Sequence, residues 1–122
     1  KAQSGSAQSL GESLISQPDK EISVDIGDSA TLPCCVSEKI VGMIAWFKQP
    51  DGKQPEMIVK LFKFVGDRID IEFRNPRFQT EKHSNCFNII ISKINESDEA
   101  MYYCAQTYPD IVFANGTPLK IK

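Results

Sequence analysis

The sequence predicts an all-β sandwich, and three observations support this fold class. Apolar and polar residues alternate in several short runs, turn-forming residues separate these runs, and no run of about ten or more residues repeats its apolar positions at helical spacing. The chain has 122 residues, of which 41% are hydrophobic and 25% are charged. This length and balance are typical of one globular domain.

The first stretch, from Lys1 to about Gln17, is rich in Ser, Gln, Gly and Ala and has few large apolar side chains. Such a composition buries too little surface to fix the backbone, so we expect a frayed leader or an expression remnant. The first two strands then lie on either side of a turn at Gly27-Asp28 and span residues 22–26 and 30–35.

The later strands are bounded by similar turns. Asp51-Gly52 is a strong hairpin signal between two of them. Residues 95–100 fit one helical turn. The remaining predicted strands, which bring the total to about nine, span residues 44–48, 56–62, 69–73, 77–80, 87–92, 101–106 and 112–121.

Net charge and the length of the apolar runs exclude two classes of partner. Lys and Arg total 14 against 16 for Asp and Glu, which gives a net charge of -2 with no basic excess for nucleic acid. The apolar runs, such as residues 89–91, are far shorter than the roughly 18 residues of a spanning helix. We therefore expect no nucleic-acid partner, and membrane attachment only through segments outside this chain.

Metal binding and catalysis have little support in the sequence. A structural zinc site needs close ligand pairs, but Cys86 and Cys104 stand alone, and His83 is the one histidine of the chain. The adjacent pair Cys34-Cys35 is not a Cys-x-x-Cys redox motif. Ser29 has no Gly-x-Ser-x-Gly elbow around it. We expect no cofactor, no metal and no enzymatic activity.

Cys34, Trp46 and Cys104 occur in the order in which the immunoglobulin fold places two bridged cysteines and the tryptophan that packs on them. Tyr102 stands two positions before the second cysteine, at the tyrosine-corner position. The chain from Ile15 to Lys122 therefore resembles an immunoglobulin domain. Residues 1–14 are then the leader, and residues 15–122 are the domain.

The resemblance is to the variable type with about nine strands in a Greek key, because two extra strands fit between Trp46 and Arg77. Arg77 and Asp98 match the pair that forms a salt bridge in variable domains. Residues 113–121 are similar to a joining segment. That similarity fails at Ala114, where the family has glycine, so we expect an altered bulge there.

Among variable domains, the chain looks most like the novel immune-type receptors of bony fish. The motifs that carry this resemblance lie at residues 17–20, 37–46, 48–53 and 95–98. It implies the extracellular domain of a plasma-membrane receptor that recognises a protein on another cell. A T-cell-receptor-like variable domain and a homophilic adhesion module are the alternatives.

Side-chain direction predicts the cysteine pairing. Cys34 shares its strand face with Leu32 and points inward, so Cys35 points outward; Cys86 points outward because Phe87 points inward. In a variable domain these two strands are neighbours. We therefore expect Cys34–Cys104 through the core and Cys35–Cys86 across the surface, with two free thiols as the alternative to the second bridge.

One face of the predicted sandwich is unusually aromatic. If Trp46 and Cys104 point inward, then Phe47, Tyr103 and Ala105 point outward on the same sheet. The resemblance adds further positions on the surface through which variable domains pair. The predicted dimer interface is Phe47, Gln49, Pro55, Met57, Tyr103 and Phe113. The alternative is that neighbouring loops cover these side chains.

Loops at one end of the domain contain apolar residues that a partner would cover. Tyr108 and Asp110 are the strongest contact candidates, because tyrosine offers a rigid amphipathic surface. Ile111 and Val112 could instead fold back onto the sheet. The predicted ligand loops comprise Glu38, Lys39, Ile40, Val41, Gln106, Thr107, Tyr108, Pro109, Asp110 and Ile111.

Two sequons, at Asn95 and Asn115, match the N-glycosylation acceptor pattern. The first lies at a corner between strands and could accept a glycan. The second lies in the joining-like bulge, where Asn and Gly also have a backbone reason to occur.

Overall fold

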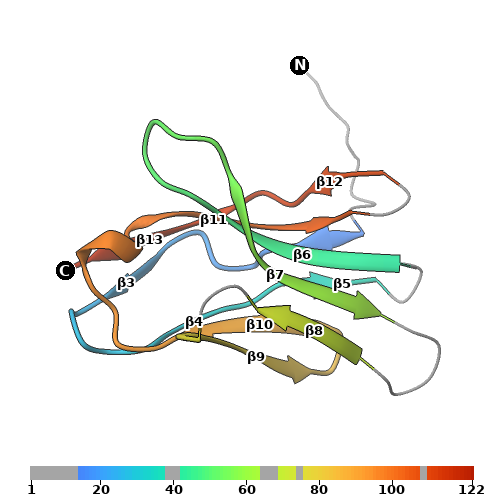
Figure 1. Ribbon diagram of the computed structural model, residues 1–122, viewed down its shortest axis with the longest axis horizontal. Coiled ribbons are helices and arrows are strands. Elements are labelled where there is room, and N and C mark those ends of the chain that lie inside the picture. The colour runs from blue at the N-terminus through green and yellow to red at the C-terminus, as the bar shows by residue number, and fades with distance from the viewer. Residues whose placement is uncertain (1–13, 38–41, 64–68, 74–75, 108–109) are drawn as a thin grey trace.

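Two β-sheets face each other in the computed structural model (Figure 1). The structure describes residues 14–37, 42–63, 69–73, 76–107 and 110–122, and for 61–63 and 69–73 it describes the backbone only. The all-β sandwich is thus confirmed. Within these residues no helix is long and apolar enough to cross a membrane. The predicted helical turn is the short 3₁₀ helix η1 (Glu96–Asp98).

The first sheet is built around β10 (Cys86–Ile91). On one side β10 pairs with β4 (Ala30–Leu32) and β5 (Cys35–Val36), and on the other side with β9 (Phe78–His83). β2 (Ile15–Ser16) extends the sheet beyond β5. β4 and β5 are the two parts of one predicted strand, which is interrupted where proline at position 33 has no N–H for the ladder.

The second sheet runs in the order β3, β13, β11, β6, β7 and β8, with β12 also paired to β11. Its pairs are antiparallel except for β3 with β13, which is parallel. These strands are β3 (Ile22–Val24), β13 (Thr117–Ile121), β11 (Ala100–Gln106), β6 (Gly42–Gln49), β7 (Glu56–Lys63), β8 (Ile69–Phe73) and β12 (Val112–Phe113).

Alternate side chains of both sheets fill the space between them. Trp46 of β6 and Tyr102 of β11 are fully buried against Leu32 and Ile89 of the opposite sheet. The indole Nε1 of Trp46 donates a hydrogen bond of 3.1 Å to the carbonyl of Phe87, so the buried N–H is satisfied by the other sheet. The period of two that predicted the strands also builds this core.

The last predicted strand is divided into β12 and β13 by a bulge. Ala114 N–H donates to the carbonyl of Cys104, and the register with β11 shifts by one residue before Thr117. Gly116 has a φ of +86°, whereas Ala114 is not among the residues with positive φ. The expected alteration at Ala114 is therefore not needed, because the left-handed backbone falls on the glycine two positions later.

The sandwich begins earlier than composition indicated. Ile15 is buried and pairs with Val36, and Gln17 is 2% exposed. The prediction of a frayed segment as far as Gln17 was therefore wrong at its end. The strand β2 has only two residues, so it shows almost no alternation of apolar and polar positions. The next buried side chain, that of Gln17, is polar and gives no hydrophobic signal.

Candidate protein-binding surface

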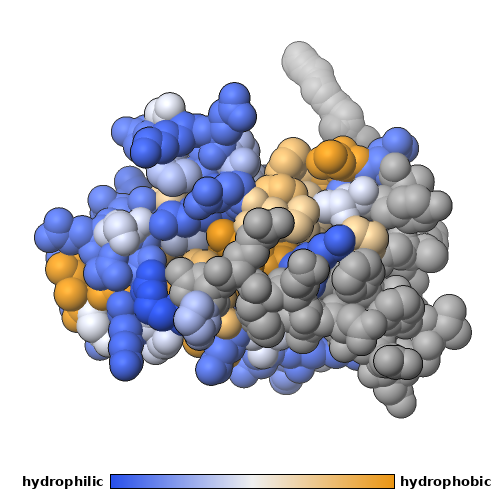
Figure 2. All heavy atoms as spheres, viewed as in Figure 1, coloured by the Kyte–Doolittle hydropathy of each residue, from blue (hydrophilic) through white to orange (hydrophobic). Residues whose placement is uncertain are grey.

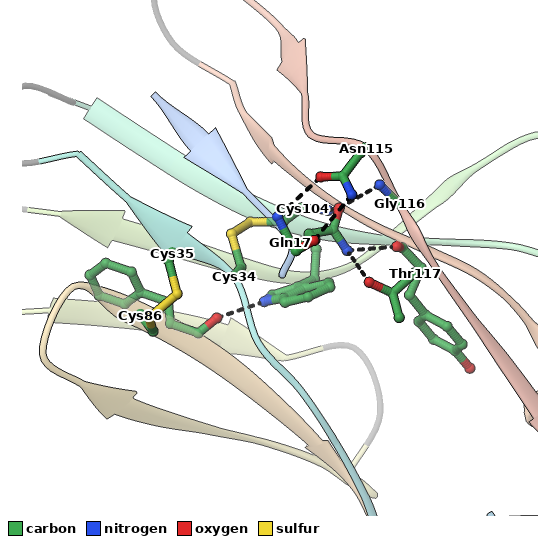
Figure 3. The surroundings of a disulfide bond; sticks show 11 residues. Gln17, Cys34, Cys35, Cys86, Cys104, Asn115, Gly116 and Thr117 are labelled. Carbon is green, nitrogen blue, oxygen red and sulfur yellow. Dashed lines mark hydrogen bonds between the residues drawn. A yellow bond between two sulfur atoms is a disulfide. The ribbon is translucent and has the colours of Figure 1, made fainter. Parts of the chain in front are cut away.

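The four cysteines form two bridges in different surroundings (Figure 3). Cys34 is joined to Cys104, and both are fully buried between the sheets. Cys35 is joined to Cys86, its direct partner across β5 and β10, and both are half-buried. The structure thus pairs the cysteines according to the direction of their side chains, and none of the four is free.

Gln17 joins the N-terminal segment to the second sheet, and sequence reasoning missed this role. Its Nε2 donates to the carbonyl of Tyr102 at 2.9 Å and to Thr117 Oγ1 at 3.2 Å. Its Oε1 accepts the backbone N–H groups of Cys104 and Gly116, each at 3.0 Å (Figure 3). All the polar atoms of this buried amide are therefore satisfied. The signal in the sequence is a glutamine followed by proline, where the chain must leave one sheet for the other.

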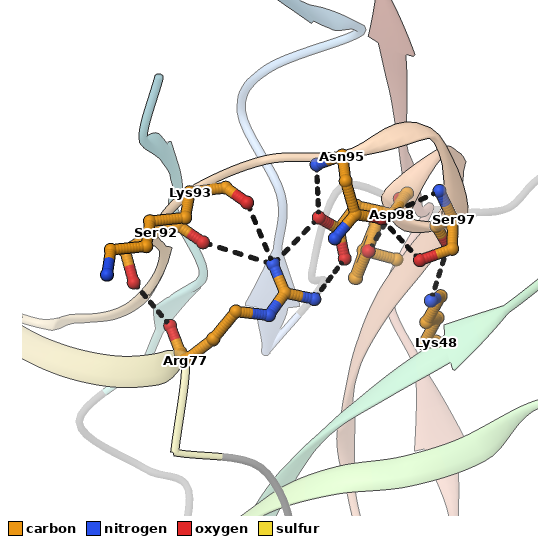
Figure 4. Close-up of polar contacts among 8 residues, drawn as sticks. Lys48, Arg77, Ser92, Lys93, Asn95, Ser97 and Asp98 are labelled. Carbon is orange, nitrogen blue, oxygen red and sulfur yellow. Dashed lines mark hydrogen bonds and ion pairs between the residues drawn. The ribbon is translucent and has the colours of Figure 1, made fainter. Parts of the chain in front are cut away.

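The salt-bridge pair lies at the corner before β11 (Figure 4). Arg77 donates to both carboxylate oxygens of Asp98, at 2.7 and 2.9 Å, and the N–H of Asn95 donates to the same carboxylate at 2.9 Å. Asp98 is fully buried, and burial raises its pKa, but these hydrogen bonds together with the positive charges of Arg77 and Lys48 lower it by more, so the pKa lies below its ordinary value. The Tyr102 hydroxyl donates to the carbonyl of Asp98 at 2.7 Å. Burial raises the pKa of Tyr102, so the phenol remains protonated as a donor.

An aromatic cluster lies on the outer face of the second sheet. Phe113 of β12 meets Phe47 of β6 and Tyr103 of β11 edge to face, with ring centroids 5.3 and 5.8 Å apart. Phe113 remains 47% exposed. Figure 2 shows apolar atoms gathered around β12, while hydrophilic residues dominate the opposite end of the view.

The other predicted interface residues lie around this cluster. Met57 is half-buried and pairs with Phe47 across β6 and β7, and Pro55 is exposed in the turn before it. Gln49 is half-buried, and its Nε2 donates to the carbonyl of Lys53 within its own turn. Ala105, which was expected to point outward on the same sheet, is fully buried and therefore adds no exposed surface to this cluster.

The predicted ligand loops are described in part. Glu38, Lys39, Ile40, Val41, Tyr108 and Pro109 lie outside the described residues. Thr107 donates its backbone N–H to Met43 at 2.8 Å, and Gln106 reaches the carbonyl of Asp110 at 3.4 Å. Ile111 is 64% exposed and Val112 is 51% exposed, so these two side chains do not fold back onto the sheet.

Among the described residues no three His, Cys, Asp or Glu side chains are grouped as metal ligands. His83 is exposed at the end of β9. The outer face around Phe113 offers apolar and aromatic contact beside polar groups, which is the composition of a protein interface.

Residues 17–122 match the family model of the immunoglobulin V-set domain. The chain belongs to the immunoglobulin V-set family. This V-set domain is 35% identical over 103 residues to the rat tyrosine-protein phosphatase non-receptor type substrate 1, covering 83% of the chain and 19% of that protein. The chain therefore spans about a fifth of the length of this relative.

Solved structures show the same fold. A chain from the structure on T cell specificity and activation by the bacterial superantigen toxic shock syndrome toxin-1 has a TM-score of 0.73 at 15% identity, covering 88% of the V-set domain and 98% of that chain. A marsupial T cell receptor has a TM-score of 0.72 at 22% identity, covering 88% of the V-set domain and 51% of that chain. At these identities the likeness concerns the fold.

Proposed function

We propose that this V-set domain is the extracellular ligand-binding part of an innate-type immune receptor in the plasma membrane, and that it binds a protein on another cell. One observation carries the proposal. Three consecutive large apolar residues, Ile111, Val112 and Phe113, are 64%, 51% and 47% exposed at one end of the second sheet. Exposed apolar residues gathered beside polar ones are a feature of protein-binding sites.

We also propose the finer assignment to the novel immune-type receptors of bony fish, supported by the motifs at residues 17–20 and 95–98. The functional unit in this proposal is residues 15–122, with 1–14 as a leader. Burial of Ile15 supports that boundary. A T-cell-receptor-like variable domain is the alternative within the same family.

A second candidate function is self-association through the second sheet. The contact of Phe113 with Phe47 and Tyr103 favours it, because these rings form one continuous apolar surface. Such a surface would pair symmetrically with a second copy of itself.

Staining of living cells tests the first proposal. Fluorescent tetramers of the domain should bind a subset of cell types, and mild protease treatment of those cells should abolish the staining. Tetramers with both Cys34 and Cys104 replaced by alanine serve as a misfolded control. Staining that survives protease, or equals this control on every cell type, would contradict recognition of a surface protein.

A further inference from the structure

The two sequon asparagines use their side-chain amides differently. Both Asn95 and Asn115 are exposed as residues, and both are followed by a hydroxyl residue at the second position. The sequence alone does not separate them. The hydrogen bonds of their Nδ2 atoms do, because Nδ2 is the atom to which an N-linked sugar is attached.

Asn115 makes a reciprocal pair with the backbone of Gln17 (Figure 3). Its Oδ1 accepts the Gln17 N–H at 3.1 Å, and its Nδ2 donates to the Gln17 carbonyl at 3.1 Å. Both bonds go to one residue, so one edge of the Asn115 amide faces Gln17. That edge carries Oδ1 and the Nδ2 hydrogen on the same side as Oδ1.

A sugar on Nδ2 would replace that hydrogen. Attachment turns the primary amide into a secondary amide, whose trans form places the substituent on the same side as the oxygen. The opposite arrangement is disfavoured, as a cis secondary amide is. A glycan on Asn115 would therefore remove the donor to Gln17 and place its first sugar against the segment that Gln17 anchors.

Asn95 has no such conflict. Its Oδ1 accepts the Ser97 N–H at 2.9 Å and also the Ser97 hydroxyl, which caps η1. Its Nδ2 has no protein partner among the described residues, and the side chain stands at an exposed corner (Figure 4). A sugar on this nitrogen leaves every hydrogen bond of the corner in place.

We propose that the folded protein carries an N-linked glycan on Asn95 and an unmodified amide on Asn115. The proposal rests on the proposed extracellular function, because this transfer occurs in the secretory pathway. Asn95 Nδ2 forms a bond to C1 of the first sugar of an oligosaccharide linked to a lipid pyrophosphate. The bond from C1 to the pyrophosphate oxygen breaks, the lipid pyrophosphate leaves with the electron pair, and the nitrogen loses one proton.

The location of Asn95 keeps the glycan away from the candidate binding surface. Asn95 precedes the start of β11 at Ala100, whereas Gln106 at the other end of this strand pairs with Val112. A strand of this length spans roughly 20 Å. Asn115, in contrast, adjoins Gly116, where an added Cβ would lie 2.6 Å from a ring carbon of Tyr103 in the aromatic cluster.

The test is a glycan map of the folded chain. The chain is expressed behind a cleavable secretion signal in a eukaryotic cell, and folded protein from the medium and from the cells is pooled. The 26 residues between Lys93 and Lys120 include no Lys or Arg, so trypsin does not separate the two sequons, whereas a protease that cleaves after Glu99 does. The digest is treated with an enzyme that removes N-linked glycans and converts each glycosylated asparagine to aspartate. Because Asn-Gly also deamidates unaided, a digest without this enzyme is the matched control.

We expect a glycan on the Asn95 peptide and none on the Asn115 peptide. Ser97→Ala should abolish the glycan mass shift of the whole protein, and Asn115→Gln should leave that shift unchanged. A glycan on Asn115, or no glycan on either residue, would overturn the proposal. Both results are independent of cell staining, so a glycosylated domain that stains no cell would count against the proposed function alone.

Discussion

The ring of Phe113 meets the ring of Phe47 edge to face, with centroids 5.3 Å apart. Phe113 is on β12 and Phe47 is on β6, so the contact spans β11, which lies between these strands. Edge-to-face aromatic pairs contribute about 0.5–1.5 kcal/mol beyond their buried area. The apolar surface is therefore held in place before any partner arrives.

Self-association should depend on this contact. Phe47→Glu should abolish dimer formation while leaving the fold intact, because the charge would be desolvated in the dimer and Phe47 is only half-buried in the monomer. Sedimentation over a range of concentrations measures the change, with Phe47→Leu as the apolar control. An unmodified domain that stays monomeric at high concentration would refute the homodimer.

Alanine substitutions at two glycines should distinguish the cost of backbone strain from the cost of steric crowding. Gly116 and Gly27 both have positive φ, but an added Cβ at Gly116 would lie 2.6 Å from a ring carbon of Tyr103, whereas at Gly27 it would meet nothing within 4 Å. Gly27→Ala should therefore cost about 1–2 kcal/mol of unfolding free energy. Gly116→Ala should cost about 1–3 kcal/mol more. Denaturant unfolding of both variants tests this, and equal losses would contradict the close approach to Tyr103.

The Asp98 carboxylate should make stability depend on acid. Its pKa is lower in the folded state, so its contribution is complete above the unfolded value of about 3.9 and is lost as the pH falls through the folded value. Asp98→Asn should cost about 3 kcal/mol at pH 7, the low end for a buried pair, because Arg77 is 26% exposed. The difference from wild type in unfolding free energy should shrink below about pH 4. A difference that is constant with pH would contradict this account.

The two disulfides should differ in what their loss does to the fold. The domain should remain folded when Cys35 and Cys86 are both replaced by alanine, because their bridge lies on the outer face. Replacing Cys34 and Cys104 should cost about 2–5 kcal/mol and open a cavity in the core. Circular dichroism and denaturant unfolding distinguish the outcomes. Peptide mapping that finds Cys35 joined to Cys104 would contradict the strand register itself.

Residues whose role follows from strand alternation could be predicted from the sequence. The inward direction of Cys34 and Trp46, and the outward direction of Cys35 and Phe47, each follow from the period of two. The similarity to a joining segment indicated the bulge that divides β12 from β13. The interruption near Pro33 depends on a single position in the ladder, and the sequence did not indicate it.

The contacts of Gln17 and Asn115 could not be predicted in this way. Their amides bond to backbone groups 98 or more residues away in several cases, and no local pattern encodes so distant a partner. Composition instead placed Gln17 in a frayed segment. A buried amide that satisfies backbone groups of β11 and of the bulge before β13 appears only when the sheets are assembled.

A titration of cell binding tests the location of the binding surface most directly. Ile111 and Ile26 are a matched pair, 64% and 58% exposed. Ile111 precedes β12. Ile26 lies at the other end of the domain, next to Gly27, whose N–H donates to the carbonyl of Ile94. Tetramers with Ile111→Asp should bind ligand-bearing cells at least about tenfold more weakly than wild type, and Ile26→Asp should bind like wild type. Undiminished binding by Ile111→Asp would contradict a binding surface at β12.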